Sequence, residues 1–266
     1  MRQTLRPVEI LLVNDNDEED PRSKNLKTKL VMYPEVRYLS KGRHSGTSSA
    51  RNFGIEHASG DWIAFLDDDD EWIAGKLEKQ AAIVAEHPEA SLVFGLGIVV
   101  NEDGTERGPV WQASVFKPNP GYKDMLKHDY VGSTSQVMVR RDLAVRLGGF
   151  RDLPAEEDYD FWIRIAQHAA IYGTDEYLYR KHCVNGGHVS ANHRNNYIGY
   201  REIYRSRKRA YRTYKDARRH ICYNIVREGA KAMQPGILPY IAVMGADAAA
   251  ESAAGLLRTI LEAGRD

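Results

Sequence analysis

The stretch Gly60-Asp61-Trp62-Ile63-Ala64-Phe65-Leu66-Asp67-Asp68-Asp69-Asp70-Glu71-Trp72 joins an apolar run to a block of carboxylates. The run from Trp62 to Leu66 is short, partly β-branched and aromatic, which predicts a strand buried on both faces of a largely parallel sheet. The acids follow at the C-terminal end of this strand, where ligands bind in open α/β sheets. The position therefore favours a functional site.

The charges of this acidic block also favour a functional site. Two like charges about 4 Å apart repel by about 4 kcal/mol at an effective dielectric constant of about 20. No Lys or Arg follows the block until Lys76, so a divalent cation would relieve the repulsion. The alternative is a solvated acidic turn that caps a helix beginning near Glu71. Because a buried strand precedes the acids, we favour the metal site.

Composition describes an ordinary globular chain. The 266 residues contain 37 Lys plus Arg and 37 Asp plus Glu, so the total charge indicates no polyanionic partner. The two cysteines, Cys183 and Cys222, form no CxxC pair, and no charged and then apolar leader opens the sequence, which predicts a reduced, cytoplasmic setting. The apolar segment 235–257 is interrupted by Asp247 and Glu251, so it predicts an amphipathic helix and no membrane span.

A second apolar strand, predicted over residues 8–13, also ends in polar residues, Asn14-Asp15-Asn16-Asp17. A carboxylate just past a parallel strand can accept hydrogen bonds from a ribose or a base edge. A simple turn and helix cap explains Asp15 equally well, and both interpretations stay open. Residues 36–39 predict the next short strand.

Residues 41–58 form a loop of small residues that runs into a helix whose N-cap is expected to be Thr47 or Ser48. The free N–H groups of such a helix start, with Arg51 one turn further on, suit a diphosphate or a nucleotide base. The spacing matches neither GxGxxG nor the P-loop pattern, so neither of those nucleotide sites is supported.

A second acidic cluster, Glu156-Glu157-Asp158-Tyr159-Asp160, precedes the helical segment 161–166. Acids in a first turn stabilise a helix by about 0.3 to 1 kcal/mol, which is a sufficient structural explanation for one or two of them. Because several acids crowd this turn, one of them is also a candidate general base.

The remaining elements follow from periodicity and turn residues. We predict a helix over 73–84, a strand over 90–100 and a hairpin that returns through Val110-Trp111. A loop passing into a short helix over 117–129, a strand over 136–139, a helix over 142–147 and a strand over 177–182 complete the order. His182 is a candidate metal ligand or acceptor contact, although an isolated His is more often neither.

From Asn195 onward, basic residues alternate with tyrosines, most densely over 200–219. One interpretation is docking on an anionic membrane surface or a lipid phosphate. The other, which we favour, is a solvated helix whose tyrosines pack on the domain. No nucleic-acid partner is expected, because no recognised motif is present.

The assembled motifs resemble the GT-A glycosyltransferases of family 2. The likeness begins with Gly46 and the segment 50–55 and continues through 58–72. Gly148-Gly149-Phe150 and then Glu157-Asp158-Tyr159-Asp160, with Trp162 and Arg164, resemble the acceptor-side Glu-Asp motif of that family. The segment from Tyr179 to Ser190 resembles its closing strand, so the likeness covers roughly residues 3 to 190.

The resemblance implies an α/β fold of the nucleotide-diphospho-sugar transferase type, with a mostly parallel central sheet flanked by helices. It divides the chain into a GT-A domain over 1–194 and a basic, amphipathic helical extension over 195–266. Relative to the family, the sequence lacks the usual first strand and helix, about 25 residues by typical element lengths. That strand would line the base pocket.

The resemblance also implies inverting transfer of a sugar from a UDP- or GDP-linked donor to a hydroxyl of a glycan or lipid-linked acceptor, in cell-surface polysaccharide or glycolipid synthesis. The nucleotide-sugar site would comprise Asp15, Gly46, Arg51, Asn52, Asp67, Asp68 and Asp69. The metal site for Mg2+ or Mn2+ would comprise Asp69, Asp70 and His182, with the register of the four-Asp run open by one. The catalytic residues would be Asp158, which would take the acceptor proton, and the adjacent Glu157.

Two other functions remain as alternatives. The chain could be a non-catalytic binding or scaffold protein that lost its base pocket with the first strand. A nucleotidyltransferase on a related fold, releasing pyrophosphate, is the third hypothesis. In each case the expected location is the cytoplasm, with the 200–219 stretch as the candidate contact to a membrane surface.

Overall fold

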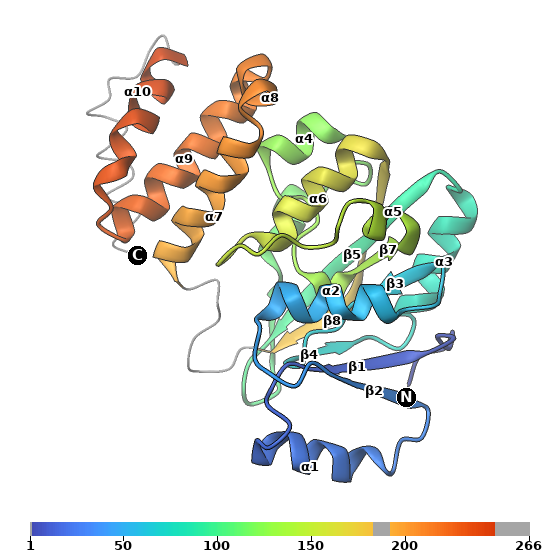
Figure 1. The fold of residues 1–266 in the computed structure, drawn as a ribbon. Coiled ribbons are helices and arrows are strands. Elements are labelled where there is room, and N and C mark those ends of the chain that lie inside the picture. Colours follow the sequence, from blue (N-terminus) through green and yellow to red (C-terminus); the bar gives the residue numbers. More distant parts are fainter. Residues whose placement is uncertain (1, 183–191, 248–266) are drawn as a thin grey trace.

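The computed structural model describes residues 2–182 and 192–247 (Figure 1). Its main sheet has the strand order β3-β7-β5-β8-β4, and β6 pairs with β5 outside this path. The strands are β3 (Trp62–Ala64), β4 (Asp70–Trp72), β5 (Ala90–Val100), β6 (Glu106–Pro109), β7 (Val137–Arg140) and β8 (Ala170–His182). The long strands β5 and β8 lie side by side at the centre of the sheet.

The sheet is mixed, which corrects the prediction of a mostly parallel one. Only β5 and β8 pair in parallel in the main sheet, while β3 with β7, β7 with β5 and β8 with β4 are antiparallel. An apolar run suits the interior of either kind of sheet, so the composition of residues 62–66 could not specify the direction of their neighbour. β3 is also shorter than predicted and only partly buried.

The first two strands form a separate parallel pair. β1 (Ile10–Asn14) and β2 (Val36–Ser40) are joined through helix α1 (Pro21–Leu30), which lies on the far side of this pair (Figure 1). In the described part of the chain, no strand lies between β1 and β3. A cavity runs between them and is lined by Leu11, Val13 and Ile63.

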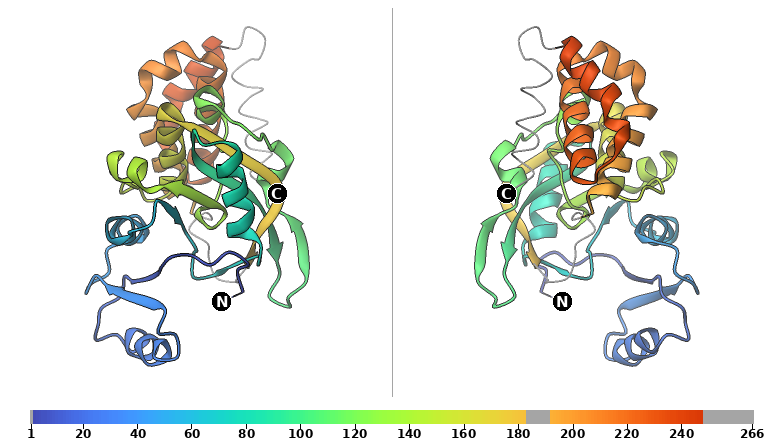
Figure 2. Two further views of the ribbon diagram at one scale, coloured as in Figure 1. Left: turned by 90° about the vertical axis from the view of Figure 1, so that its right-hand side faces the viewer. Right: turned by 90° about the vertical axis from the view of Figure 1, so that its left-hand side faces the viewer.

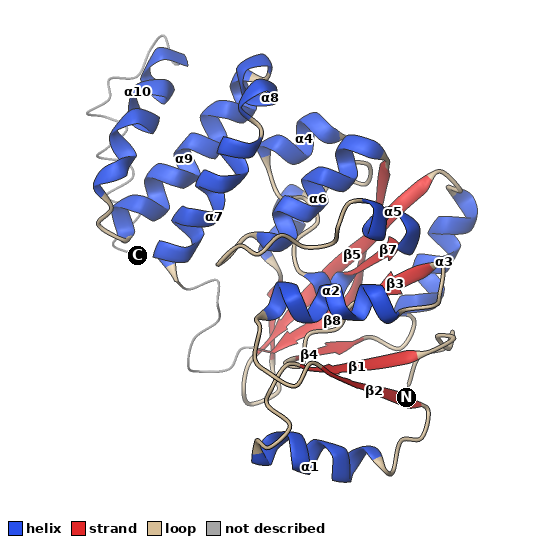
Figure 3. Ribbon diagram, viewed as in Figure 1, coloured by secondary structure: helices blue, strands red, loops and turns tan. Residues whose placement is uncertain are grey.

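Helices cover the two faces of the main sheet (Figure 3). Their bounds are α2 (Thr47–His57), α3 (Lys76–Glu86), α4 (Tyr122–Lys127), α5 (Arg141–Arg146) and α6 (Glu157–His168). Side chains of β5 alternate between the faces. Leu92 and Phe94 join the large core with Trp162 of α6, whereas Val93 packs with Ile83 of α3. The alternation fixes α6, and therefore its N-terminal acids, on the face opposite α3.

Four further helices follow: α7 (His193–Ser206), α8 (Lys208–Thr213), α9 (Lys215–Lys231) and α10 (Leu238–Asp247). They stand together at one side of the molecule, as the two rotated views also show (Figure 2). Tyr197, Tyr211 and Ile225 belong to the same hydrophobic core as Trp162 of α6. The tyrosines of the basic stretch therefore pack against the domain, as favoured. The stretch forms parts of three helices and not one. The boundary predicted at 194/195 is not marked by a separate core.

Several predicted boundaries differ from those observed. The predicted strand over 90–100 is confirmed as β5, whereas the helix predicted from residue 73 begins at Lys76 because Asp70–Trp72 forms strand β4. β8 begins at Ala170, seven residues before the predicted start at Tyr177. Short 3-10 turns occupy Trp111–Val115, Thr134–Gln136 and Pro235–Ile237. The predictions for 183–190 and 248–257 lie outside the described residues. Within the described ranges, no helix has the length and apolar character needed to cross a membrane.

Candidate active site

The acidic turn between β3 and β4 is anchored through its first residue, Asp67. The Asp67 carboxylate accepts a hydrogen bond of 2.8 Å from the Arg51 guanidinium and two of 3.0 Å from the Thr134 hydroxyl. The Asp67 backbone N–H donates to the Ser135 hydroxyl at 3.1 Å. With these contacts made, Asp67 serves the scaffold of the turn, and the carboxylates available to a ligand are those that follow it.

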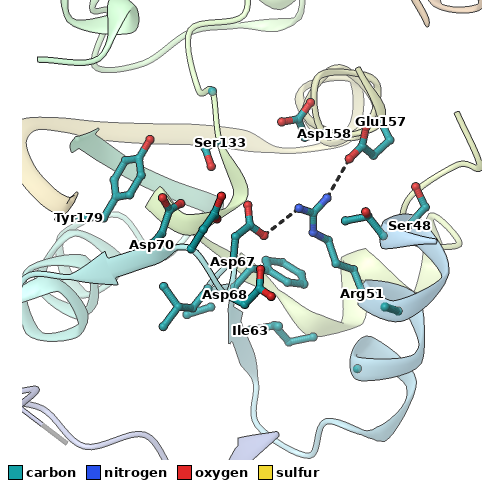
Figure 4. A pocket seen from close by; sticks show the side chains of 18 of the residues that line it. Ser48, Arg51, Ile63, Asp67, Asp68, Asp70, Ser133, Glu157, Asp158 and Tyr179 are labelled. Carbon is teal, nitrogen blue, oxygen red and sulfur yellow. Dashed lines mark hydrogen bonds and ion pairs between the residues drawn. The ribbon is translucent and has the colours of Figure 1, made fainter. Parts of the chain in front are cut away.

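Asp68, Asp69 and Asp70 follow this anchor in the sequence, and Figure 4 shows Asp68 and Asp70 beside Asp67. The side chains of Asp68 and Asp69 are exposed, whereas Asp70 opens β4 and is partly buried. One Asp70 carboxylate oxygen accepts no hydrogen bond from the described residues. Burial raises the pKa of Asp70 to about 6, and the charges of Asp67 and Asp69 add to the rise, while a hydrogen bond from Ser135 opposes it. A buried oxygen that lacks a partner beside further carboxylates suits a hard divalent cation.

Arg51 links the acidic turn to the helix on the other side of the cavity (Figure 4). It projects from the second turn of α2, with its side chain only 14% exposed. One guanidinium nitrogen lies 2.8 Å from Asp67 and another lies 2.9 Å from a carboxylate oxygen of Glu157 at the start of α6. Arg51 also stacks on the Phe150 ring, with 5.3 Å between guanidinium carbon and ring centroid. A single planar cation therefore ties both acidic clusters together.

Asp158, the residue after Glu157, has a different environment. Burial and the neighbouring Glu157 and Asp129 carboxyls together raise its pKa to about 8, although the positive charge of Arg51 acts in the opposite direction. Its own carboxylate accepts a hydrogen bond of 2.7 Å from the Tyr159 backbone N–H. A carboxyl that titrates near neutral pH inside a cavity has the properties of a general base.

Asp15 and Gly46 lie together on the wall of the same cavity. Burial works to raise the pKa of Asp15, but hydrogen bonds from the Ser45 hydroxyl and from the backbone N–H groups of Ser45 and Gly46 lower it overall. Gly46 has φ of 88°, a conformation that favours glycine, and it caps α2 in place of the predicted Thr47 or Ser48. Asp15 thus orders the loop that leads into α2.

Two predicted site residues are placed elsewhere. The Asn52 amide donates to the Phe150 carbonyl at 2.8 Å and accepts from the Phe150 N–H at 2.7 Å, so it is used in holding the Gly149-Phe150 turn. His182 lies 3.8 Å from Glu71. Because side chains alternate along β4, Glu71 points to the face opposite Asp70, and His182 is not part of the cavity wall. Neither Asn52, predicted for the nucleotide-sugar site, nor His182, predicted for the metal site, lines the cavity.

Other polar residues join the site without having been predicted. Trp72 donates its indole N–H to the Ser135 carbonyl at 2.9 Å, and Tyr179 and Lys181 of β8 also line the cavity. The polar run Ser133-Thr134-Ser135 before a strand was a visible signal. Its partners 63 to 68 residues away were not visible from the sequence.

One cavity of about 2590 Å3 is lined by Asp15, Gly46, Arg51, Asp158 and the run from Asp67 to Asp70. It extends from the gap between β1 and β3, past Asp67 to Asp70, to Asp158 and the helices α7 and α9. Among the residues that the structure describes, no three His, Cys, Asp or Glu side chains are grouped to hold a metal ion. A cation at Asp70 would accordingly share its coordination with a second molecule, as Mg2+ often does with phosphates.

A mixed sheet with an acidic turn at a strand end, facing a carboxylate at a helix start, defines a glycosyltransferase fold of the GT-A type. The model of glycosyl transferase family 2 matches residues 1–147, and the chain belongs to this family.

Relatives with curated descriptions include an uncharacterized glycosyltransferase, YwdF, of Bacillus subtilis. It is 36% identical over 174 residues, which are 62% of this chain and 60% of YwdF. The Escherichia coli protein WfgD, a UDP-Glc:alpha-D-GlcNAc-diphosphoundecaprenol beta-1,3-glucosyltransferase, is 28% identical over 165 residues, again 62% and 60% of the two chains. The matches span 60%, 32% and 54% of the length of the first three curated relatives.

Among solved structures, the mannosyltransferase PcManGT of Pyrobaculum calidifontis, in complex with GDP-Man and Mn2+, has a TM-score of 0.58. Its sequence is 15% identical, and the match covers 97% of this chain and 71% of PcManGT. This similarity concerns the fold.

Proposed function

We propose that this chain transfers a sugar from a UDP- or GDP-linked donor to a hydroxyl of a glycan or lipid-linked acceptor, with inversion at the transferred carbon. The observation that carries the proposal is the cavity in which the acidic edge at Asp70 and the carboxyl of Asp158 open toward one space, with Arg51 between their clusters. A donor diphosphate fits the first side and an acceptor hydroxyl fits the second.

Asp69 and Asp70 are the residues that would hold Mg2+ or Mn2+, since the unpartnered oxygen of Asp70 and the exposed carboxylate of Asp69 supply hard oxygen ligands. A bound ion would neutralise charge on the departing nucleoside diphosphate. Mn2+ accompanies GDP-Man in the PcManGT complex, which supports this assignment. Asp15, Gly46 and Asp68 line the donor side of the cavity beside these residues.

Asp158 takes the proton from the acceptor hydroxyl as that oxygen attacks the sugar carbon. Only one base is then needed for a single displacement, and its product has the inverted configuration. Glu157 is engaged by Arg51, so it positions the start of α6 and leaves the proton transfer to Asp158. The name of WfgD supports a lipid-linked acceptor, and with it cell-surface polysaccharide or glycolipid synthesis at the cytoplasmic side of a membrane.

The test is hydrolysis and binding of UDP- and GDP-sugars by the full chain with Mn2+. Asp70→Asn should weaken Mn2+-dependent nucleotide binding at least tenfold, and Asp158→Asn should retain binding but lose transfer. Asp142→Asn, an exposed aspartate on α5, is the matched control. Equal turnover in the wild type and both site variants would refute the assignment.

A non-catalytic binding protein remains the second candidate, and one observation favours it. In the part of the chain that the structure describes, β1 pairs only with β2 and β3 only with β7, and residues of both strands line the cavity where a base would bind. Calorimetry separates the two hypotheses. Tight, metal-dependent binding of UDP or GDP together with sugar release supports the enzyme, whereas binding without turnover supports the alternative.

A further inference from the structure

The cavity continues beyond Asp158 into a lobe, here called the helical lobe, between the start of α6 and the C-terminal helices. Asp129 and Glu156 line it from the transferase side. Tyr200 of α7 and His220 of α9 line it from the helical side. Because Asp158 is the proposed base, the acceptor occupies this lobe.

Glu156 is fixed in the lobe by α7. Its backbone has φ of 64°, a left-handed conformation that is uncommon outside glycine and asparagine. Gly199 lets α7 approach closely, because a Cβ there would lie 2.4 Å from the Ala155 carbonyl oxygen and 3.0 Å from the Glu156 Cβ. The adjacent Tyr200 shares a side-chain hydrogen bond with Glu156. α7 therefore places a carboxyl and a phenol side by side, next to Asp158.

In the helical lobe Glu156 and His220 are uncharged near neutral pH, whereas Asp129 is mostly ionised. Burial raises the pKa of Asp129 to about 6, and burial with the nearby Asp158 and Asp129 raises that of Glu156 well above its usual value. Burial, together with the adjacent His128, lowers the pKa of His220 to about 4. The two imidazole rings lie 3.8 Å apart.

Arg227, which also lines the lobe, is already engaged. Its guanidinium lies 2.9 Å from a carboxylate oxygen of Glu228, which is itself only 6% exposed. Because this cation has a partner, an anionic ligand would find carboxyl groups in the lobe without an unopposed positive charge to receive it.

We propose that the helical lobe binds a neutral, hydroxyl-bearing sugar residue of the acceptor, with Glu156 and Tyr200 as hydrogen-bonding groups and with discrimination against acidic sugars. The proposal rests on the proposed transferase function. A carboxyl and a phenol both donate and accept hydrogen bonds, as sugar hydroxyls do. An acidic sugar would place a carboxylate beside Asp129, which is mostly ionised at neutral pH, and beside Asp158, which must be ionised to act as base, so like charges would repel.

The test compares two acceptors that differ only at the sixth carbon, octyl β-glucoside and octyl β-glucuronide. The full chain is supplied with the nucleotide sugar that it hydrolyses, and hydrolysis without acceptor is measured in parallel. We expect kcat/KM for the glucoside to exceed that for the glucuronide at least tenfold. Tyr200→Phe and Glu156→Leu should each raise the KM for the glucoside about tenfold, and so narrow the preference between the two acceptors, because each variant removes a hydrogen-bonding group. Tyr33→Phe, at an exposed tyrosine, is the control.

Each outcome decides the proposal. Preference for the glucuronide, or no transfer to the glucoside while donor hydrolysis persists, would overturn the neutral-sugar assignment and leave the proposed function standing. Unchanged KM and unchanged preference in both variants would remove Glu156 and Tyr200 from acceptor binding. Absence of donor hydrolysis in the wild type would refute the proposed function and this inference with it.

Discussion

Replacing Arg51 by Met tests whether one cation holds the two acidic clusters together. The substitution keeps an unbranched side chain but removes the guanidinium, and so leaves Asp67 and Glu157 without their partner at 2.8 and 2.9 Å. Loss of one partner costs about 3 to 5 kcal/mol in a buried ion pair, and exposed pairs contribute about 0 to 1 kcal/mol. The three side chains are 14%, 30% and 16% exposed, so the network lies between these limits. We expect the free energy of unfolding to fall by about 2 to 3 kcal/mol.

Arg51→Lys separates the contribution of the positive charge from that of the planar guanidinium. An ammonium keeps the charge but is a point donor, so it cannot span both carboxylates as the planar guanidinium does. We expect a loss of about 1 to 1.5 kcal/mol in stability. Because the relative position of the acidic turn and α6 would relax, transfer activity should fall more than stability suggests, by roughly 100-fold in kcat/KM.

Urea denaturation, followed by circular dichroism, measures both variants. A double-mutant cycle of Arg51→Met with Glu157→Gln should give a coupling energy of about 1 kcal/mol or more. Arg146→Met is the control, because its partner Asp142 is 3.7 Å away and both side chains are more than 60% exposed. A change below about 0.5 kcal/mol for Arg51→Met, with no coupling to Glu157, would refute the bridge.

Three further predictions concern the base, a buried lysine and a tight helix contact. Transfer should increase with pH, with a midpoint near about 8, because Asp158 must lose its proton to act as base; a flat profile from pH 6 to 9 would contradict this role. Burial lowers the pKa of Lys76 to about 7, so the unfolded chain binds more protons above that pH, and this residue's contribution to the free energy of unfolding should rise by up to about 1.4 kcal/mol per pH unit toward pH 10. The difference between wild-type and Lys76→Met urea titrations isolates this slope, and parallel curves would contradict it. Gly199→Ala should lower stability by about 1 to 3 kcal/mol because its Cβ meets the Ala155 carbonyl, whereas Gly245→Ala, with open space around it, should not; equal unfolding midpoints would exclude the tight contact.

The order of elements could be read from the sequence because local patterns specify it. The apolar run over 90–100 is long and uninterrupted, and it forms β5 with the predicted bounds. The direction and neighbours of the strands depend on contacts between distant residues, and an apolar run carries no such information. For the same reason β4 was missed, since Asp70-Glu71-Trp72 has the composition of a turn and becomes a strand only through pairing with β8.

In the candidate site too, the residues that local patterns specify could be predicted, and those that depend on distant contacts could not. Asp158 and the run from Asp67 to Asp70 could be predicted because like charges are crowded there. Such charges repel one another, and a bound ligand or a catalytic role explains why they are present. Asn52 and His182 were chosen by their neighbours in the sequence, but the direction of each side chain is decided by tertiary contacts, with Phe150 and Glu71 respectively. The helical lobe could not be predicted, because Glu156 and Tyr200 meet only when Gly199 allows α7 to approach.

The network around Arg51 also explains why each acidic cluster contains more carboxylates than the proposed chemistry needs. Arg51 neutralises one carboxylate in each cluster, Asp67 in the first and Glu157 in the second. Asp70, with a pKa of about 6, and Asp158, with a pKa of about 8, form no ion pair with Arg51. Had Arg51 paired with Asp158, the base would be held ionised but poorly basic. Because Arg51 pairs with the adjacent Glu157, the same cation fixes the geometry of both clusters and leaves Asp70 to the proposed donor site and Asp158 to the proposed proton transfer.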